Sequence, residues 1–262
     1  MSIRILFILG LLLCLAQAWI SIQQPGPAGF MLSQELEAGG EPVYQEQFAS
    51  GGGTREVHSA GVVELSNGDI RSVWYGGHAD VAIYTNVWDA TSSRWGREQI
   101  AIDMKTTRDG TGRYSRKLGN PVITRGSDDE LWLFYVSAVG GWATSSINLA
   151  ISRDEGESWG APRRLITSPS FNFSTLVKGK AVHFSDGSIG LPVYHEFLAK
   201  FGELLRLDTN GEVIDKARQS WGRNALQPEI LPYGEHEAIA LLRYAGDPPR
   251  RIMIQSTQDT GL

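Results

Sequence analysis

Cysteine is nearly absent from this chain of 262 residues, since Cys14 is the only one. A single cysteine cannot form an intramolecular disulfide, so the fold must hold without covalent cross-links. Basic residues are not in excess either: 24 Lys and Arg stand against 29 Asp and Glu, a net charge of −5, which argues against a nucleic-acid partner. No metal-ligand spacing, glycine-rich phosphate loop or Ser-His-Asp order is evident, so we expect neither a metal nor a cofactor.

Long apolar runs are also missing, except at the N-terminus. Arg4 precedes an apolar stretch over residues 5–15, and residues 16–18 (Ala-Gln-Ala) form a small-x-small cleavage pattern. The apolar run over residues 5–22 also reaches the lower limit for spanning a bilayer, so an uncleaved anchor is the alternative. We expect residues 1–22 to direct export to the periplasm or the exterior, with any membrane association through this segment only.

The rest of the chain is rich in turn and aromatic residues and contains an internal repeat. It has 30 Gly, 8 Trp and 8 Tyr. Four segments, starting near 60, 120, 180 and 228, each show an apolar strand, a turn with Gly or acidic residues, and two further apolar strands. Trp-Gly pairs at 95–96 and 159–160, and a looser match at 221–222, are expected to precede a fourth strand. Four-stranded units repeated radially indicate an all-β fold, a β-propeller.

This repeat divides the chain into three parts. Residues 1–22 form the targeting segment, and residues 23–55, rich in Pro, Gly and Glu, form a linker or irregular approach. Residues 56–262 hold the partial propeller, with about three and a half blades.

One motif occupies the predicted turn between the third and fourth strands of the second blade. It reads Ser/Thr-x-Asp-x-Gly-x-x-Trp, and its residues are Ser152, Asp154, Gly156 and Trp159. The Asp side chain can accept hydrogen bonds from backbone N–H groups of its own turn, and the Gly can adopt a positive φ. The Trp can pack back as an apolar plug. These roles are structural, so the motif predicts a fold rather than a reaction.

The same motif begins again at Thr257, with Asp259 and Gly261 in the corresponding positions. The sequence ends before the expected tryptophan. We therefore expect this chain to be a fragment of a longer protein.

In a propeller, the loops that enter the first strand and leave the second strand share one face, opposite these turns. Loops on a rigid scaffold are where ligands usually bind. The side chains predicted on this face are His58, Tyr75, Asp80, Asn120, Tyr135, Lys178, Lys180, Tyr194, His195, Glu196, Gln227, Arg243 and Tyr244. A basic stretch over residues 105–117 is predicted to be a long loop on the same face. Such a mixture of cations, carboxylates, imidazoles and phenols suits an anionic sugar.

Structural roles compete with these assignments. A tyrosine that ends a strand more often packs than catalyses, and the basic stretch could be a solvated excursion. His183, inside a strand next to Phe184, is expected to be structural.

The motif, the blade plan and the phrase Ser-Asn-Gly-Asp at 66–69 resemble the sialidase (neuraminidase) superfamily over most of residues 56–262. The motif is the "Asp box" of that superfamily. The chain is similar to bacterial sialidase-like exo-glycosidase proteins whose blades open with His-Ser-Ala, Asn-Pro and Gln-Pro, as at 58–60, 120–121 and 227–228. The resemblance implies a propeller of six blades when complete and the hydrolysis of terminal acidic sugars.

The resemblance also implies roles for single residues. Sialidases hold the substrate carboxylate with three arginines, protonate with an Asp and use a Tyr–Glu pair as nucleophile. Asp80 matches the acid/base, Arg243 could be a carboxylate-binding arginine, and Glu196 could activate a nucleophile or act as a base. His58 stands where the first arginine is expected, and the nucleophilic tyrosine would lie beyond Leu262.

Three functional interpretations follow. The first is a sialidase-like hydrolase, with His58, Asp80 and Glu196 as catalytic groups and Arg243, His195, Asn120, Lys180, Gln227 and Tyr75 as substrate-binding groups. The second is a His-based glycosidase or polysaccharide lyase on the same fold. The third is a non-catalytic propeller that binds glycans or another protein.

Overall fold

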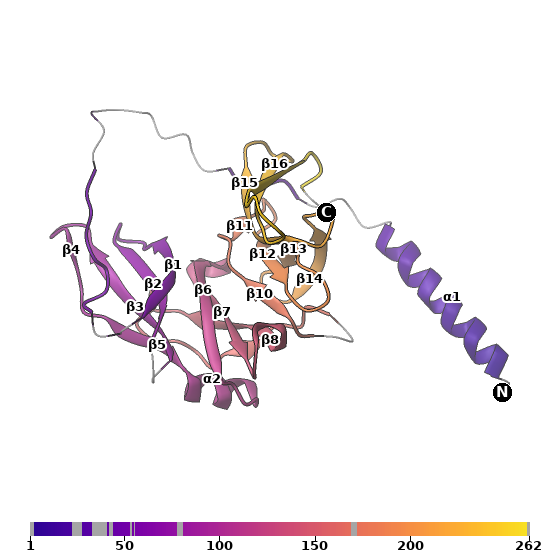
Figure 1. Ribbon diagram of the computed structural model, residues 1–262, viewed down its shortest axis with the longest axis horizontal. Coiled ribbons are helices and arrows are strands. Elements are labelled where there is room, and N and C mark those ends of the chain that lie inside the picture. Colours follow the sequence, from indigo (N-terminus) through magenta and orange to yellow (C-terminus); the bar gives the residue numbers. More distant parts are fainter. Residues whose placement is uncertain are drawn as a thin grey trace.

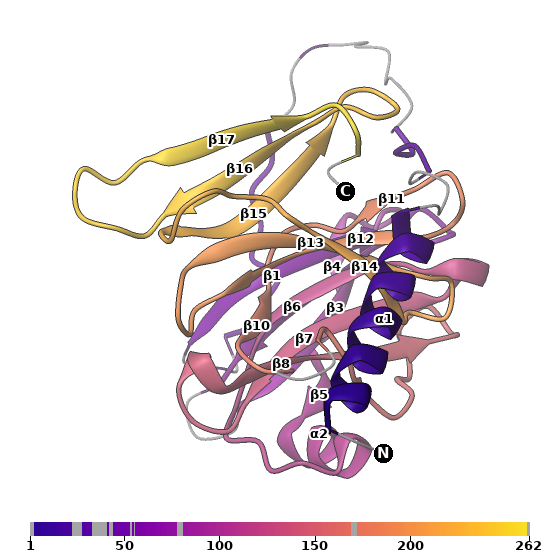
Figure 2. The same cartoon turned by 90° about the vertical axis from the view of Figure 1, so that its right-hand side faces the viewer.

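The computed structural model describes residues 3–22, 28–32, 41, 44–52, 54, 56–77, 81–168 and 172–260. Four antiparallel sheets follow one another along the chain and are arranged radially (Figures 1 and 2). Each sheet begins with its innermost strand and proceeds outward in chain order. This architecture confirms the prediction of an all-β propeller.

Blade 1 has the expected strands, but its outer strand is divided. Its strands are β1 (Val57–Glu64), β2 (Ile70–Gly76), β3 (Ala82–Asp89), β4 (Arg94–Trp95) and β5 (Gln99–Asp103). Both β4 and β5 pair with β3, so the strand predicted after the first Trp-Gly pair is β5, with a two-residue strand before it.

Blade 2 is the best-enclosed sheet. Its strands are β6 (Lys117–Arg125), β7 (Leu131–Ala138), β8 (Ser145–Ser152) and β9 (Arg163–Arg164). Every residue of β7 is buried. Because side chains alternate across a strand, the two faces of β7 supply two different hydrophobic clusters.

Those clusters lie between neighbouring blades. The odd-numbered β7 residues join β2, β3 and β5 in a cluster between blades 1 and 2; they are Leu131, Leu133 and Tyr135. The even-numbered residues join a cluster between blades 2 and 3; they are Trp132, Phe134 and Val136. A third cluster lies between blades 3 and 4. The blades are thus held together mainly by apolar burial.

Blade 3 differs from the prediction at its inner strand. Its strands are β10 (Thr175–Val177), β11 (Val182–His183), β12 (Ile189–His195), β13 (Phe201–Leu207) and β14 (Val213–Arg218). Both β10 and β11 pair with β12, so the inner strand begins at residue 175, not near 180, and is interrupted over residues 178–181.

The Trp-Gly pair at 221–222 does not introduce a fourth strand, and that prediction is wrong. The strand in question is β14, which ends at Arg218, and the Trp221 side chain is 86% exposed. The physical reason lies in the preceding turn. Asp208 Oδ1 accepts from the backbone N–H groups of Asn210 and Glu212. These bonds make the turn after β13 short, so β14 starts directly after Glu212.

Blade 4 has three strands within the described residues, as predicted. They are β15 (Ala225–Pro232), β16 (Ala238–Tyr244) and β17 (Ile252–Thr257).

Two α-helices lie outside the sheets. α1 (Ile3–Ile22) stands apart from the blades, and its side chains over residues 4–16 are exposed (Figure 1). Within the part of the chain that the structure describes, no helix has the length and apolarity needed to cross a membrane.

α2 (Met104–Thr111) corrects the prediction of a loop over residues 105–117, whose first part is helical. Asp103 caps its N-terminus by accepting from Thr106 N (2.6 Å), and Gly112 ends it with φ 64°. Two short 3-10 turns, η1 (Ser127–Asp129) and η2 (Trp142–Thr144), flank β7.

The described part of the expected approach segment makes defined contacts with the propeller. Residues 28–32 lie between blades 3 and 4, where Phe30 N donates to Glu235 O (2.6 Å) and Met31 N donates to His183 O (2.7 Å). The Phe30 ring is 4% exposed and stacks on Phe184, with centroids 5.1 Å apart. This segment therefore joins the third hydrophobic cluster.

Candidate active site

The inner strands of three blades contain the same irregularity near their N-terminal ends. In each of these strands, two consecutive residues lie opposite a single residue of the second strand. The first of the two has a left-handed backbone. These residues are Ser59 (φ 58°), Asn120 (φ 47°) and Gln227 (φ 53°). Such β-bulges re-aim a side chain, here a polar one in each blade. The repeat therefore presents polar groups at one level of the ring.

Hydrogen bonds join these groups across four blades into what we call the mouth cluster: Ser59, Asn120, Lys178, Tyr194 and Gln227. Ser59 Oγ donates to Asn120 Oδ1 (3.3 Å), and Asn120 Nδ2 donates to the Tyr194 hydroxyl (3.0 Å). Lys178 Nζ donates to Ser59 Oγ (2.8 Å), and the Gln227 side chain hydrogen-bonds the Tyr194 hydroxyl. Residues far apart in the sequence thus form one polar network.

We call the face of the propeller around this cluster the mouth. His58 and Tyr75 lie on its blade 1 side. Their ring centroids are 4.5 Å apart, and His58 Nδ1 lies 3.0 Å from Ser59 Oγ. The His58 side chain is exposed. Burial, and then repulsion from Glu56, raise the pKa of the Tyr75 hydroxyl.

The electrostatics of the mouth favour binding an anion. Burial, and then repulsion from Arg243, lower the pKa of Lys178. Burial is also the main cause that raises the pKa of the Tyr194 hydroxyl. Among the described residues, neither Lys178 nor Arg243 forms a salt bridge. Their charges are therefore left for a negatively charged ligand.

A pocket of about 210 Å³ lies beside the cluster. Its polar lining combines one carboxylate, that of Glu196, with the cationic side chains of Lys200, Arg243 and Arg250. Glu196 is half-buried, and its backbone N–H donates to Ser174 Oγ (3.2 Å). This arrangement can hold an anionic group on the cations and offer a carboxylate to a reacting atom.

The structure brings His58, Tyr75, Asn120, Gln227, Glu196 and Arg243 to this mouth, but it places two predicted residues elsewhere. His195 Nε2 lies 2.7 Å from Glu203 Oε2 within blade 3, and its ring stacks on Phe201. Burial is the largest influence on Glu203 and opposes its ionisation, but the hydrogen bond from His195, together with the charges of His195, Lys216 and Arg218, lowers the pKa of that carboxyl. His195 is therefore already engaged within its own sheet.

Lys180 is the second of these residues. It lies beside His183 and Arg125 on a different pocket, along the inner strands, while its backbone N–H faces Glu229. The side chain that reaches the cluster is that of Lys178. Asp80 lies outside the described residues. No group of three or more metal-binding side chains occurs within the described ranges.

Ser59 is the member of the cluster that the sequence analysis did not place on this face. The signal for Ser59 was present, since the phrases at 58–60, 120–121 and 227–228 mark the repeated bulge. The contact between Tyr194 and Asn120 joins residues of two blades, and no local pattern encodes it.

The Asp box lies in the turn between β8 and β9, as predicted. Ser152 Oγ donates to Asp154 Oδ1 (2.7 Å) and accepts from Gly156 N (2.7 Å), while Trp159 packs on the cluster between blades 1 and 2. In the second copy, Thr257 Oγ1 donates to Asp259, and Gly261 lies outside the described residues.

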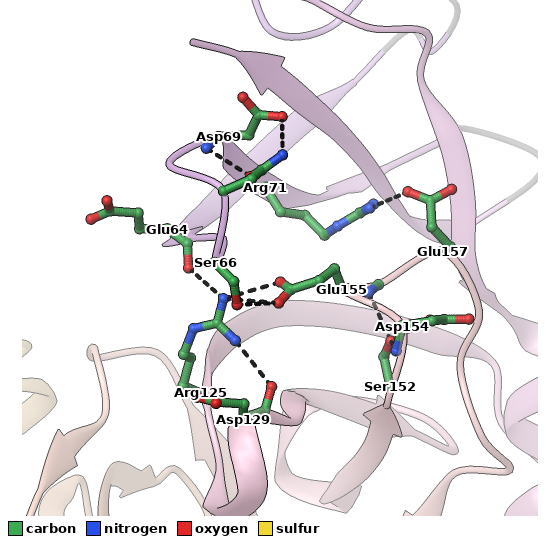
Figure 3. A network of polar contacts seen from close by, with 12 residues as sticks. Glu64, Ser66, Asp69, Arg71, Arg125, Asp129, Ser152, Asp154, Glu155 and Glu157 are labelled. Carbon is green, nitrogen blue, oxygen red and sulfur yellow. Dashed lines mark hydrogen bonds and ion pairs between the residues drawn. The ribbon is translucent and has the colours of Figure 1, made fainter.

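Acidic residues of the box reach from blade 2 to blade 1 (Figure 3). Glu155 accepts from Ser66 Oγ (2.7 Å) in the β1–β2 turn and pairs with Arg125 (3.0 Å) at the end of β6. The β1–β2 turn is at the opposite end of β1 from Ser59. The box therefore stabilises the face of the propeller opposite the mouth.

Comparisons with known proteins agree with this architecture. The BNR repeat-like domain family matches residues 68–262. No curated protein is similar to the chain in sequence.

Several solved sialidases have a similar fold at low sequence identity. Hadza microbial sialidase Hz136 has a TM-score of 0.62 at 15% identity, over 79% of this chain and 47% of that one. The NanB sialidase from Streptococcus pneumoniae has a TM-score of 0.65 at 11% identity, over 83% and 52%. The Trypanosoma rangeli sialidase, in complex with the inhibitor DANA, has a TM-score of 0.60 at 15% identity, over 79% and 37%.

The chain thus spans about half, or less, of the length of these structures. Such identities show a shared fold. With three complete blades, an Asp box and a family match over most of its length, the chain belongs to the BNR repeat-like domain family and has the β-propeller fold of the solved sialidases.

Proposed function

We propose that this chain forms part of an exported, sialidase-like glycoside hydrolase that acts on terminal acidic sugars of glycans. The sugar carboxylate binds to Arg243, and Asp80 is the general acid. Glu196 and His58 are supporting catalytic groups around the same sugar. Asn120, Gln227 and Tyr75 position the ring at the mouth.

The observation that carries this proposal is the charge arrangement at the mouth. Lys178 and Arg243 come from blades 3 and 4, repel each other, and share their surroundings with Glu196. An anionic ligand would relieve that repulsion, and guanidinium groups bind carboxylates in a bidentate manner. The Trypanosoma rangeli sialidase has been solved in complex with sialic acid, which supports the choice of an acidic sugar.

A second candidate is a polysaccharide lyase, and the pair of His58 and Tyr75 favours it. An imidazole and a phenol in contact can serve as base and acid in β-elimination next to a uronic carboxylate. This reaction needs no arginine at position 58. Its products carry a double bond that absorbs in the ultraviolet.

The direct test is incubation of the full-length protein with a fluorogenic sialoside and, separately, with uronic-acid polysaccharides. We expect sialoside turnover, a kcat lower by about 100-fold or more in Asp80→Asn, and a higher KM in Arg243→Ala. Arg94→Ala, at an exposed arginine of β4, is the matched control and should leave both constants unchanged.

Other outcomes select the alternatives. Ultraviolet-absorbing products that disappear in His58→Ala would establish the lyase. Sugar binding by calorimetry, weakened in Arg243→Ala and without any product, would establish a non-catalytic glycan-binding propeller. Turnover that Asp80→Asn leaves intact would overturn the assigned acid.

A further inference from the structure

Ser59 has an unusual set of neighbours for a serine in a strand. Its Oγ contacts Lys178 Nζ (2.8 Å), His58 Nδ1 (3.0 Å) and Asn120 Oδ1 (3.3 Å). Its backbone is left-handed, with φ 58°, and the residue is half-buried at the solvent-facing mouth. The Lys178 amine donates to this hydroxyl in its charged form, and at the same distance it could accept the hydroxyl proton once it has lost its own. This placement meets the geometric requirement for an activated nucleophile.

Lys178 is suited to act as the base. It is half-buried, and the charged group recorded beside it is Arg243 on β16. The other titratable groups of the mouth contact its neighbours: His58 lies at Ser59, and Glu196 acts on Tyr194. A lysine that is partly desolvated beside another cation loses its proton more readily than a free lysine. Serine–lysine pairs are an established variant of the nucleophile–base arrangement.

A comparison of the repeated bulges shows that the backbone does not require Ser59 to be a serine. Blades 2 and 4 fill the same left-handed bulge position with Asn120 and Gln227, so the backbone does not require a serine there. Among these three bulges, only that of blade 1 carries a hydroxyl, and this hydroxyl faces the amine of blade 3. Amide side chains could complete the hydrogen-bond network, but they could not attack a carbonyl carbon.

We propose that Ser59 is a nucleophile, activated by Lys178, and that the mouth hydrolyses small acyl esters carried by a sugar. The reaction runs in those molecules whose Lys178 has lost its proton. Ser59 Oγ forms a bond to the acyl carbon and its proton passes to the Lys178 amine. The ester C–O bond breaks as that proton moves to the departing sugar oxygen. Water then attacks the acyl-serine, gives one proton to Lys178, and releases the carboxylic acid as Oγ regains its proton. The activity is distinct from cleavage of the glycosidic bond and does not rest on it.

The test uses the full chain with a fluorophosphonate probe, which phosphonylates activated serines with loss of fluoride. Intact-mass and peptide analysis should find a single adduct on Ser59, and the same protein should hydrolyse 4-nitrophenyl acetate. Lys178→Met should slow both reactions by about 100-fold. The labelling rate of the native chain should rise with pH through a transition below the ordinary pKa of lysine, and Lys178→Met should lack that transition.

The control for folding comes from blade 2. Ser59→Asn keeps a residue that tolerates a left-handed backbone, as Asn120 does, and should retain the thermal unfolding midpoint while losing the adduct. Ser92→Ala, an exposed serine in the β3–β4 turn, should label like the native chain. No adduct on Ser59 in the native chain, undiminished labelling in Ser59→Asn, or rates within twofold in Lys178→Met would each overturn the proposal.

Discussion

Arg71 Nη2 on β2 of blade 1 lies 2.5 Å from Glu157 Oε1 in the Asp box turn of blade 2. The arginine side chain is 4% exposed, whereas that of Glu157 is 65% exposed. A guanidinium buried to this extent needs a partner, since an uncompensated buried charge is costly. The box therefore supplies a neighbouring blade with the carboxylate that its buried cation requires.

Glu157→Gln should lower the free energy of unfolding by about 1–2 kcal/mol, because it leaves Arg71 buried without a carboxylate while solvent screens part of the loss. Urea denaturation would measure this. Asp109→Asn removes a partner from the exposed Lys105–Asp109 pair and should change stability by less than about 0.5 kcal/mol. Equal effects of the two substitutions would contradict the role assigned to Arg71.

Gly156 is required by both its conformation and its neighbour. Its φ is +88°, and a Cβ there would lie 2.5 Å from Arg71 Cδ. Gly156→Ala should destabilise the chain by about 1–3 kcal/mol. Gly141 is the control, because its φ is −73° and a Cβ there would have no neighbouring atom within 4 Å. If the two alanine variants unfold at the same urea concentration, the close contact between residue 156 and the Arg71 side chain is contradicted.

The acid limb of the stability curve, meaning the loss of folding stability at low pH, should depend on Asp154. Hydrogen bonds from the Ser158 side chain and backbone, and then from Ser152, lower the pKa of this carboxyl to about 2. A lowered folded-state pKa contributes stability that is fully present above the ordinary pKa and is lost as the pH falls through about 2. Unfolding curves from pH 7 to pH 2 should therefore be flatter for Asp154→Asn than for the native chain.

Ser158→Ala provides an independent check, because it removes the largest of these causes and leaves the carboxyl in place. It moves the folded-state pKa of Asp154 back towards the ordinary value, so this variant should lose less stability on acidification than the native chain. An unchanged limb in both variants would show that the box carboxylate is not linked to folding.

The N-terminal segment should stabilise blades 3 and 4. Phe30→Ala removes a ring that is 4% exposed and should lower the free energy of unfolding by about 3 kcal/mol. Met31, 60% exposed, is the matched neighbour, and Met31→Ala should have an effect of less than about 0.5 kcal/mol. Hydrogen exchange would locate the change, with faster exchange in β15 and β16 of the Phe30 variant than of the Met31 variant.

Local patterns predicted those parts of the fold whose determinants are local. The hairpin phrases placed β2 and β7 within a few residues of their observed bounds, and the spacing of the box placed its turn between β8 and β9. α2 was missed although its signals were present, since Asp103 precedes it and Gly112 follows it. Trp221 was wrongly expected to precede the fourth strand of blade 3, because a Trp-Gly pair alone does not show whether it lies before or after a strand.

The candidate site was predicted less completely. Sequence reasoning chose Lys180 because it took residue 180 as the start of the inner strand, whereas the strand begins at residue 175 and is interrupted before residue 182. Lys178 and Lys180 both lie in the interruption over residues 178–181, where the alternation of a regular strand does not determine which side chain reaches the mouth. Lys178 was predicted on the face but not chosen as a binding group, although its amine is the one that contacts Ser59.

The sequence by itself determined the family, the order of the blades and the structural nature of the Asp box, because strand alternation and turn chemistry are properties of neighbouring residues. Only the tertiary structure decided which polar groups meet. Ser59, Asn120, Lys178 and Tyr194 come from three different blades, and their contacts exist because apolar packing between the sheets brings the bulges to one level. That packing depends on contacts between neighbouring blades, which no local pattern describes.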